Sequence, residues 1–437
     1  MKNISIDFGS AVGKMKPMHA GCNTPRYPQH NCADGSYLYV NAGIPYVRMH
    51  DTHRVPSAEI DISAIFPDMS KDASDPANYN FPTSDAYIRE IYKNDIPVRY
   101  RLGQTIEHHD IKLNIFPPKD PQKWADVCVG IYKHFNEGWA NGMKLGIKHW
   151  EIWEEPDSHN ELWAGTEEEF FELYDKASKT LKAYAPDAYV GGCAWASIYN
   201  PFVEHFLQFV KANNCPLDFL SYDIYTNHPE DIKKSADTAR MLLDKYGFTD
   251  TFTYIAEWNN MGFMDGQPFW NTDPDIATQK EENRYSQKGM AFIAASMAMM
   301  QNTCLESAAF YVLTPRQPGW SVMNGHAKPH KNYYAFPAFN ALYQLGTQVK
   351  VEADTAYTLA AKNGSGEYAM YVSNFGDDEE TFAIDMKLEN KKYRAEYYIA
   401  DDKKNLEFAG AASFTGDFAC EYILAKDSIL LIKIKEA

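Results

Sequence analysis

The chain between residues 149 and 192 reads HWEIWEEPDSHNELWAGTEEEFFELYDKASKTLKAYAPDAYVGG. Residues 149–152 and 189–192 are short, largely apolar runs that predict two strands. Between them a capping box begins at Thr166, and apolar residues follow about one helical turn apart until Pro186. This segment therefore predicts a strand, a helix and a second strand. Such a unit places its two strands parallel, because the helix carries the chain back to the starting edge of the sheet.

The same alternation extends on both sides of this unit. Strands are expected at 18–21, 46–49, 98–102, 149–152, 189–192, 219–221, 253–256 and 309–312. Helices are expected at 36–43, 83–95, 121–141, 229–246, 275–303 and 333–345, besides the two that begin after Thr166 and at Pro201. Eight βα units are the number that closes a (β/α)₈ TIM barrel, so the fold class is α/β. A doubly wound open sheet would carry a glycine-rich phosphate loop after its first strand, and residues 21–25 (GCNTP) are not one.

The pattern changes after about residue 346, where the helical period disappears. Strands are expected at 357–361, 368–373, 381–386, 395–399 and 428–434, with a hairpin turn at 363–366 (NGSG). We therefore predict three segments. Residues 1–14 contribute a strand to the second domain, residues 15–346 form the catalytic barrel, and residues 347–437 form an antiparallel β-sandwich.

Composition limits the classes of partner. The 437 residues carry a formal net charge of −17, which disfavours nucleic acids and anionic membranes as partners. The seven scattered cysteines form no C-x-x-C pair, and no apolar run follows the N-terminus, so we expect a cytoplasmic protein. No motif predicts a cofactor or a metal, and the sequence leaves homo-oligomerisation open. Aromatic residues make up 14%, which suits either sugar stacking or a large core.

Two glutamates stand where a barrel holds its chemistry, at the C-terminal ends of strands. Glu155 follows the fourth expected strand, and Glu257 follows the seventh. Cleaving a glycosidic bond with retention needs one protonated carboxyl and one ionised carboxyl about 5 Å apart. Neighbouring acids raise each other's proton affinity, which separates these two states. We therefore expect Glu155 to be the general acid/base and Glu257 to be the nucleophile.

These segments resemble glycoside hydrolase family 39, which contains β-xylosidases and α-L-iduronidases. The family's Trp-Asn-Glu-Pro is similar to residues 153–156 (WEEP), and its Thr-Glu-Trp-Asn type of segment is similar to residues 256–259 (AEWN). Its Arg-x-His after the second strand resembles residues 48–50 (RMH), and its Lys-Pro-x-Tyr resembles residues 331–334 (KNYY) without the proline. The resemblance implies a retaining glycosidase that acts on a small carbohydrate.

Three positions depart from the family. Glu154 replaces its asparagine, Asp223 replaces the histidine of its sixth-strand motif, and residues 313–320 (LTPRQPGW) replace its Asp-x-Phe-Glu run. Four carboxyl groups would then surround one sugar subsite, with Arg48 and His50 as the only cations that the sequence places there. Such a pocket should repel a substrate carboxylate, so we expect a neutral or amine-bearing sugar rather than a uronic acid.

The remaining candidates have structural alternatives. Arg48 and His50 could bind sugar hydroxyls and orient Glu257, or form an ion pair at the barrel mouth. Tyr225 is expected to bind substrate or to pack. Four tryptophans could stack on a sugar or fill the core: Trp153, Trp195, Trp258 and Trp320.

Two other functions compete with hydrolysis. The first is a carbohydrate-binding protein on a degenerate barrel, which the loss of the family's asparagine favours and the retained glutamates oppose. The second is a metal-dependent enzyme. Its ligands would come from His50, Glu154, Glu155, Asp223 and Glu257, but no H-x-x-x-H or H-E-x-x-H spacing supports it.

Overall fold

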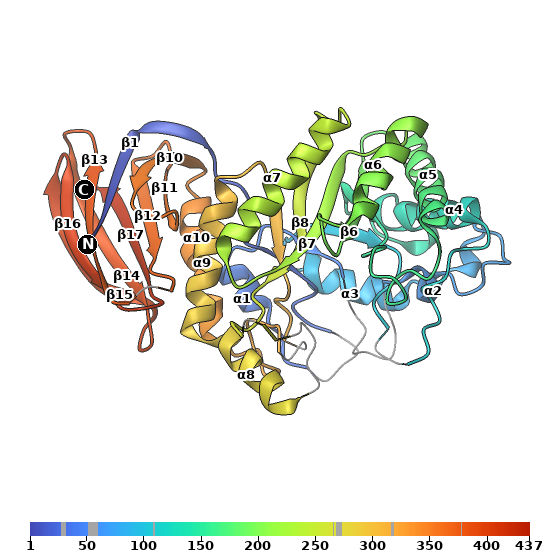
Figure 1. The fold of residues 1–437 in the computed structure, drawn as a ribbon, viewed down its shortest axis with the longest axis horizontal. Helices are drawn as coiled ribbons and strands as arrows, with labels where there is room; N and C mark the ends of the chain where they lie inside the picture. Colours follow the sequence, from blue (N-terminus) through green and yellow to red (C-terminus); the bar gives the residue numbers. More distant parts are fainter. Residues whose placement is uncertain are drawn as a thin grey trace.

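The computed structural model describes residues 1–27, 32–50, 60–107, 110–264, 266–267, 273–315, 319–376 and 378–437. Eight strands close a barrel, and a nine-stranded sheet forms a second layer of structure beside it (Figure 1). The predicted fold class, a TIM barrel with a C-terminal β-domain, is confirmed.

The barrel strands are all parallel and are paired in chain order, with the last closing on the first. They are β2 (Ala20–Cys22), β3 (Val47–Arg48), β4 (Val98–Leu102), β5 (His149–Ile152), β6 (Tyr189–Trp195), β7 (Phe219–Tyr225), β8 (Phe252–Asn259) and β9 (Ser307–Phe310). Each corresponds to an expected strand. β7 and β8 run further toward their C-terminal ends than the apolar pattern predicts, because these ends carry polar site residues such as Asp223 and Glu257. β6 also runs further, through the buried residues 193–195.

Helices alternate with the strands on the outside of the barrel. They are α1 (Ser36–Asn41), α2 (Ile62–Ile65), α3 (Pro82–Tyr92), α4 (Pro121–Asn136), α5 (Glu167–Tyr184), α6 (Pro201–Asn213), α7 (Pro229–Lys245), α8 (Pro274–Tyr285), α9 (Gln287–Gln301) and α10 (Ala335–Tyr343), with 3₁₀ turns η1 (Pro76–Asn78), η2 (Trp139–Asn141) and η3 (Lys331–Tyr334). The capping box at Thr166 is confirmed.

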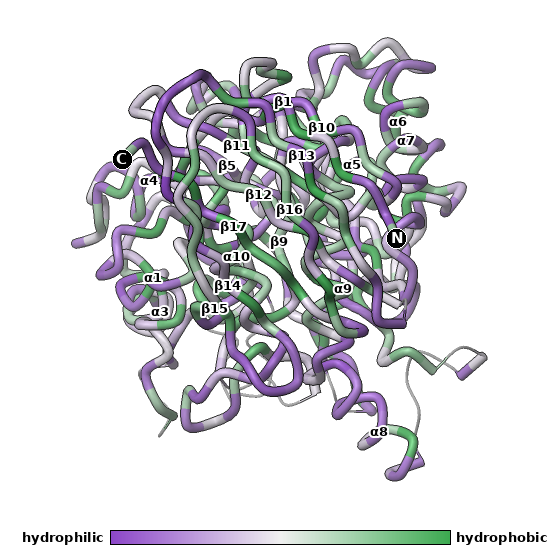
Figure 2. Tube along the Cα trace, turned by 90° about the vertical axis from the view of Figure 1, so that its left-hand side faces the viewer, coloured by the Kyte–Doolittle hydropathy of each residue, from purple (hydrophilic) through white to green (hydrophobic). Residues whose placement is uncertain are grey.

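Two expected helices are broken, so the predictions of single helices at 121–141 and 275–303 were wrong. The chain leaves α4 before Gly138, whose φ of 81° lies in the left-handed region that glycine tolerates. Ser286 separates α8 from α9, because its extended backbone ends one helix while its Oγ accepts a hydrogen bond from Gly289 N in the next. α8 is largely hydrophilic and projects away from the body of the molecule (Figure 2).

The second sheet contains both ends of the chain. Its order is β15-β14-β17-β12-β11-β10-β1-β13-β16. The strands are β1 (Lys2–Lys14), β10 (Thr347–Ala353), β11 (Thr358–Lys362), β12 (Glu367–Ser373), β13 (Glu380–Lys387), β14 (Lys392–Ala400), β15 (Asn405–Thr415), β16 (Phe418–Leu424) and β17 (Ile429–Glu436). β1 runs antiparallel to β10 but parallel to β13, since no hairpin fixes its direction relative to β13. The sequence pattern missed β10, β15 and β16, and the last two are edge strands with many exposed residues.

Helix α9 joins the barrel to this sheet. It is buried along almost its whole length, and two sheet side chains donate hydrogen bonds to its carbonyl groups. Tyr371 Oη lies 2.8 Å from Ala294 O, and Ser373 Oγ lies 2.9 Å from Ala291 O. The sheet encloses a separate apolar cluster of its own. Among the residues that the structure describes, no helix combines the length and the apolar character needed to cross a membrane.

Candidate active site

The expected site residues gather at one end of the barrel, because parallel strands bring their C-terminal ends together. Arg48 ends β3, Glu155 follows β5, and Glu257 lies near the end of β8. Asp223 of β7 is the register partner of Glu257 in β8. The structure therefore brings together the acids that the sequence places on the fourth, sixth and seventh barrel strands.

Arg48 is the centre of the site. Its side chain is fully buried, and each of its three guanidinium nitrogens donates to a different carboxylate. Nε lies 2.6 Å from Glu151 Oε2, Nη2 lies 2.5 Å from Glu154 Oε2, and Nη1 lies 3.0 Å from Glu257 Oε1. A planar guanidinium suits this task, since it holds its donors in a fixed fork. Arg48 therefore fixes three carboxylates relative to one another.

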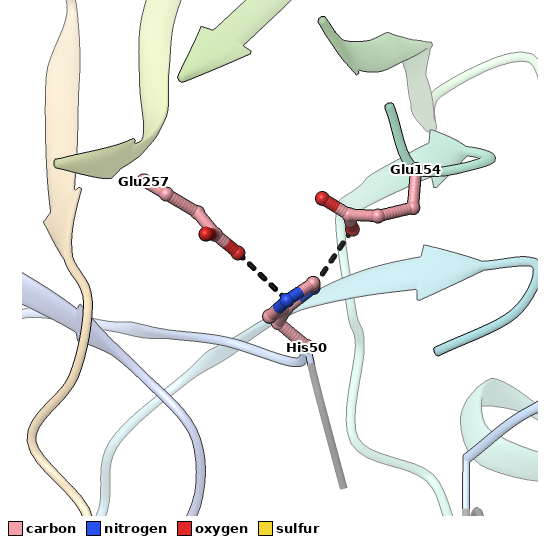
Figure 3. A group of neighbouring side chains, drawn as sticks. All are labelled: His50, Glu154 and Glu257. Atoms are coloured by element: carbon pink, nitrogen blue, oxygen red, sulfur yellow. Dashed lines mark hydrogen bonds and ion pairs between the residues drawn. The ribbon is translucent and has the colours of Figure 1, made fainter. Parts of the chain in front are cut away.

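His50 lies between two of these carboxylates (Figure 3). Its Nδ1 is 2.9 Å from Glu154 Oε2, and its Nε2 is 2.9 Å from Glu257 Oε1. Burial alone would lower the pKa of His50, but Glu154 and Glu257 outweigh it and raise this pKa to about 10. His50 is therefore an imidazolium that donates from both nitrogens at neutral pH.

The same three residues, His50, Glu154 and Glu257, are close enough to hold a metal ion. A metal-ligating histidine must offer a neutral nitrogen lone pair. Here both ring nitrogens face carboxylate oxygens, and the raised pKa keeps both protonated. In the structure as described these three side chains therefore pair with one another, and a metal ion would have to displace the ring protons.

Glu257 accepts hydrogen bonds on both of its oxygens. Besides Arg48 and His50 on Oε1, Tyr225 Oη donates to Oε2 at 2.7 Å. Glu257 as a whole residue is 5% exposed, and these donors stabilise its negative charge without covering it completely. Tyr225 thus orients Glu257, a role that the sequence did not specify.

Glu155 has the opposite environment. Burial, followed by the nearby charges of Glu257 and Glu154, raises its pKa to about 8. Among the described residues its carboxylate accepts a hydrogen bond from Ser158 Oγ, at 3.1 Å from Oε2. The backbone of Glu155 has a φ of 37°, in the left-handed region, and its N–H donates to Ala194 O. Such backbone strain costs roughly 1–3 kcal/mol and is common where a side chain must be aimed at a reacting group.

Glu154 and Asp223 differ in their surroundings. Burial opposes the ionisation of Glu154, but Arg48 and His50 hold its pKa below the ordinary value. Asp223 is 3% exposed, and neither of its oxygens has a hydrogen-bond partner among the described residues. Burial, and then the charges of Glu257, Glu154 and Glu155, raise its pKa well above the ordinary value.

Sequence reasoning missed two charged residues of this network, Arg101 and Glu151. Arg101 of β4 lies 3.6 Å from Glu154, so the expectation that Arg48 and His50 are the only cations was wrong. Glu151 of β5 binds Arg48 and also accepts from Tyr254 Oη at 2.5 Å. Arg101 and Glu151 point into the barrel from strands whose neighbouring residues are apolar. A charge inside an apolar strand was the signal that could have revealed them.

Three of the four tryptophans belong to the core rather than to a sugar platform. Trp153, Trp195 and Trp258 are fully buried and pack on other aromatic rings. Trp320 is 7% exposed, stacks under the guanidinium of Arg284 and contacts Tyr225. It is therefore the tryptophan of the four that adjoins the site. Residues 316–318 of the expected loop lie outside the described residues.

The fold and this cluster define a (β/α)₈-barrel protein with paired glutamates on its fourth and seventh strands. The model of glycosyl hydrolases family 39 matches residues 4–372, and the chain belongs to that family.

Curated relatives match parts of the chain. A β-xylosidase from Geobacillus stearothermophilus is 29% identical over 168 residues, which cover 34% of this chain and 33% of that protein. A β-xylosidase from Caldicellulosiruptor saccharolyticus is 25% identical over 297 residues, which cover 62% of this chain and 56% of that protein. The chain thus spans about a third to just over half of these relatives.

Solved structures share the fold over the whole chain. A glucosidase from Croceicoccus marinus superposes with a TM-score of 0.83 at 23% identity, covering 100% of this chain and 99% of the other. A monomeric β-xylosidase from Caulobacter crescentus CB15 gives 0.74 at 15% identity, with both chains fully covered. At these identities the likeness concerns the fold alone.

Proposed function

We propose that the protein is a retaining glycoside hydrolase, with Glu257 as nucleophile and Glu155 as general acid/base. The observation that carries the proposal is the contrast between the two carboxyls. Glu257 receives donors from Arg48, His50 and Tyr225, whereas Glu155 has its pKa raised to about 8. One anion and one protonated acid at neutral pH are the pair that retention requires.

In the first step Glu257 attacks the anomeric carbon, and Glu155 gives its proton to the glycosidic oxygen as the leaving group departs. In the second step Glu155 takes a proton from water, which attacks the anomeric carbon and releases Glu257. Arg48, His50 and Tyr225 hold the nucleophile in one orientation throughout. The protein's own residues supply every proton transfer in this scheme.

The proposed substrate is a small neutral glycoside or oligosaccharide, similar to a β-xyloside. The cations that the structure describes at the barrel mouth already face the site's own carboxylates, which leaves none of them to pair with a sugar carboxylate. Two relatives are named β-xylosidases, after a neutral sugar. All seven cysteines are free, which supports our expectation that the enzyme acts in the cytoplasm.

The test is hydrolysis of a panel of nitrophenyl glycosides by the wild type, Glu257→Gln and Glu168→Gln. Glu168 lies exposed at the start of α5 and serves as the matched control. We expect Glu257→Gln to lose at least about 10³-fold in kcat and Glu168→Gln to match the wild type. Proton NMR of the first product should show the anomer of the substrate. An inverted first product, or an active Glu257→Gln, would contradict the proposal.

A further inference from the structure

Asp223 is a buried carboxyl group that the network around it does not satisfy. It lies on β7 beside Glu257, it is 3% exposed, and the described residues give neither oxygen a hydrogen-bond partner. Buried polar groups in native proteins are almost always paired with protein or bound molecules. An unpaired carboxyl at the barrel mouth therefore indicates a group that a ligand completes.

The charges around Asp223 oppose its ionisation. Glu257 of β8, together with Glu154 and Glu155 after β5, surround it with like charge, and Arg48 of β3 is the cation that acts on it most strongly. Each of the three nitrogens of Arg48 already donates to another carboxylate. A buried anion without a donor is costly, so the uncharged acid is the stable form of Asp223 in the empty site.

Glu154 offers the complementary group. Arg48 and His50 occupy its Oε2, whereas its Oε1 is buried and has no partner among the described residues. Burial opposes charge here too, but the two cations hold the pKa of Glu154 low, so Oε1 is a charged acceptor. The subsite therefore contains one strong acceptor and one carboxylic acid that can both donate and accept.

We propose that Asp223 is a specificity-determining residue that binds the sugar as a neutral carboxylic acid, with its O–H donating to one sugar hydroxyl and its carbonyl oxygen accepting from a neighbouring hydroxyl. Glu154 Oε1 accepts from a further hydroxyl. Adjacent sugar hydroxyls supply both donors and acceptors, which is what these oxygens lack. This assignment rests on the proposed function. The sequence left open a neutral or an amine-bearing sugar, and an uncharged Asp223 favours the neutral one.

The test compares Asp223→Asn, Asp223→Ala and the control Asp237→Asn, whose carboxylate is exposed on α7. The probes are the nitrophenyl glycoside that the wild type cleaves fastest and, by calorimetry, its free sugar. Asparagine keeps one donor and one acceptor without charge. We expect Asp223→Asn to raise KM and Kd about threefold, Asp223→Ala to raise them at least tenfold, and Asp237→Asn to raise neither. Equal losses in the two Asp223 variants, or none, would overturn the proposal.

The pH dependence of binding gives a second measurement that does not depend on how well the alanine variant folds. Glu155→Gln removes the neighbouring titration and slows the chemistry, so Kd can be measured directly. In that background affinity should fall at high pH as Asp223 ionises, and Asp223→Asn should remove this part of the fall while leaving the part that His50 causes when it loses its proton at about pH 10. Affinity that rises with pH, or tighter binding of glucosamine than of glucose, would show that Asp223 works as an anion.

The proposed hydrolase activity and the proposed role of Asp223 can be refuted independently. Sugar binding that depends on Asp223 without hydrolysis of any panel glycoside would refute the hydrolase and leave the role of Asp223 standing. Hydrolysis with unchanged KM in both Asp223 variants would refute the role of Asp223 alone.

Discussion

Replacing Arg48 by methionine removes the cation that three buried carboxylates share. Methionine keeps much of the side-chain length but offers no donor itself, so Glu151, Glu154 and Glu257 each lose their ion pair with Arg48 and keep only their other hydrogen bonds. Breaking a buried ion pair by removing one partner costs about 3–5 kcal/mol of stability. Because one guanidinium serves three carboxylates here, we expect the upper end, about 5 kcal/mol at pH 7.

The loss of stability caused by Arg48→Met should depend on pH, and it should be smaller at low pH. In the wild type the pKa of folded-state Glu154 is held below the ordinary glutamate pKa. The contribution of ionised Glu154 to stability is therefore complete above the ordinary pKa and is lost as pH falls through the lower, folded-state pKa. Without Arg48, burial should raise the folded pKa of Glu154, and the variant should regain stability as this group protonates. The difference in unfolding free energy between the two proteins should therefore shrink between pH 7 and about pH 4.

The assay is urea unfolding followed by tryptophan fluorescence at both pH values. The matched control is Arg394→Met, because Arg394 pairs with Glu396 on the surface with side chains 55% and 36% exposed. Breaking that solvent-exposed pair should change stability far less than Arg48→Met does at either pH. A cost below about 1 kcal/mol for Arg48→Met, or a cost that does not change with pH, would refute the account of the network.

Three further predictions concern catalysis. Glu155→Ala should reduce kcat far more for alkyl glycosides than for nitrophenyl glycosides, because only the former need a protonated leaving oxygen, and equal losses would show that Glu155 is not the acid. Glu155 must be protonated to act, so kcat on alkyl glycosides should fall as pH rises through about 8, and a rate that stays constant to pH 10 would contradict this. Tyr225→Phe removes the 2.7 Å hydrogen bond to Glu257 and should lower kcat by about 10- to 100-fold. The midpoint of thermal unfolding should stay within a few degrees of the wild type. An unchanged kcat would show that Tyr225 has no part in the mechanism.

The sequence predicts the barrel well because its strands and helices carry independent local signals. The capping box at Thr166 and the apolar strand at β5 each specify their element without help from the rest of the chain. The edge strands β15 and β16 have no comparable signal, since their exposed faces carry mixed residues that only pairing with neighbours organises.

The sequence likewise predicts one part of the candidate site and not the other. Glu155 and Glu257 could be proposed because strand ends in a barrel converge, whatever the details of packing. Arg101 and Glu151 could not, because they reach the site from the interior of strands, and their contacts with Glu154 and Arg48 depend on side-chain direction across the barrel. The burial of Trp153 and Trp258 likewise follows from the rings that surround them, which sequence spacing does not reveal.

Trapping the glycosyl–enzyme intermediate tests the central claim most directly. A 2-deoxy-2-fluoro glycoside with a dinitrophenyl leaving group should form an ester that turns over slowly, and mass spectrometry of the digested protein should place the sugar on the peptide that contains Glu257. Glu155→Gln should still be labelled, because the activated leaving group needs no proton. Inactivation with the sugar on Glu257 is the predicted result. No covalent adduct during turnover, or an adduct on Glu154, Glu155 or Asp223, would contradict the account.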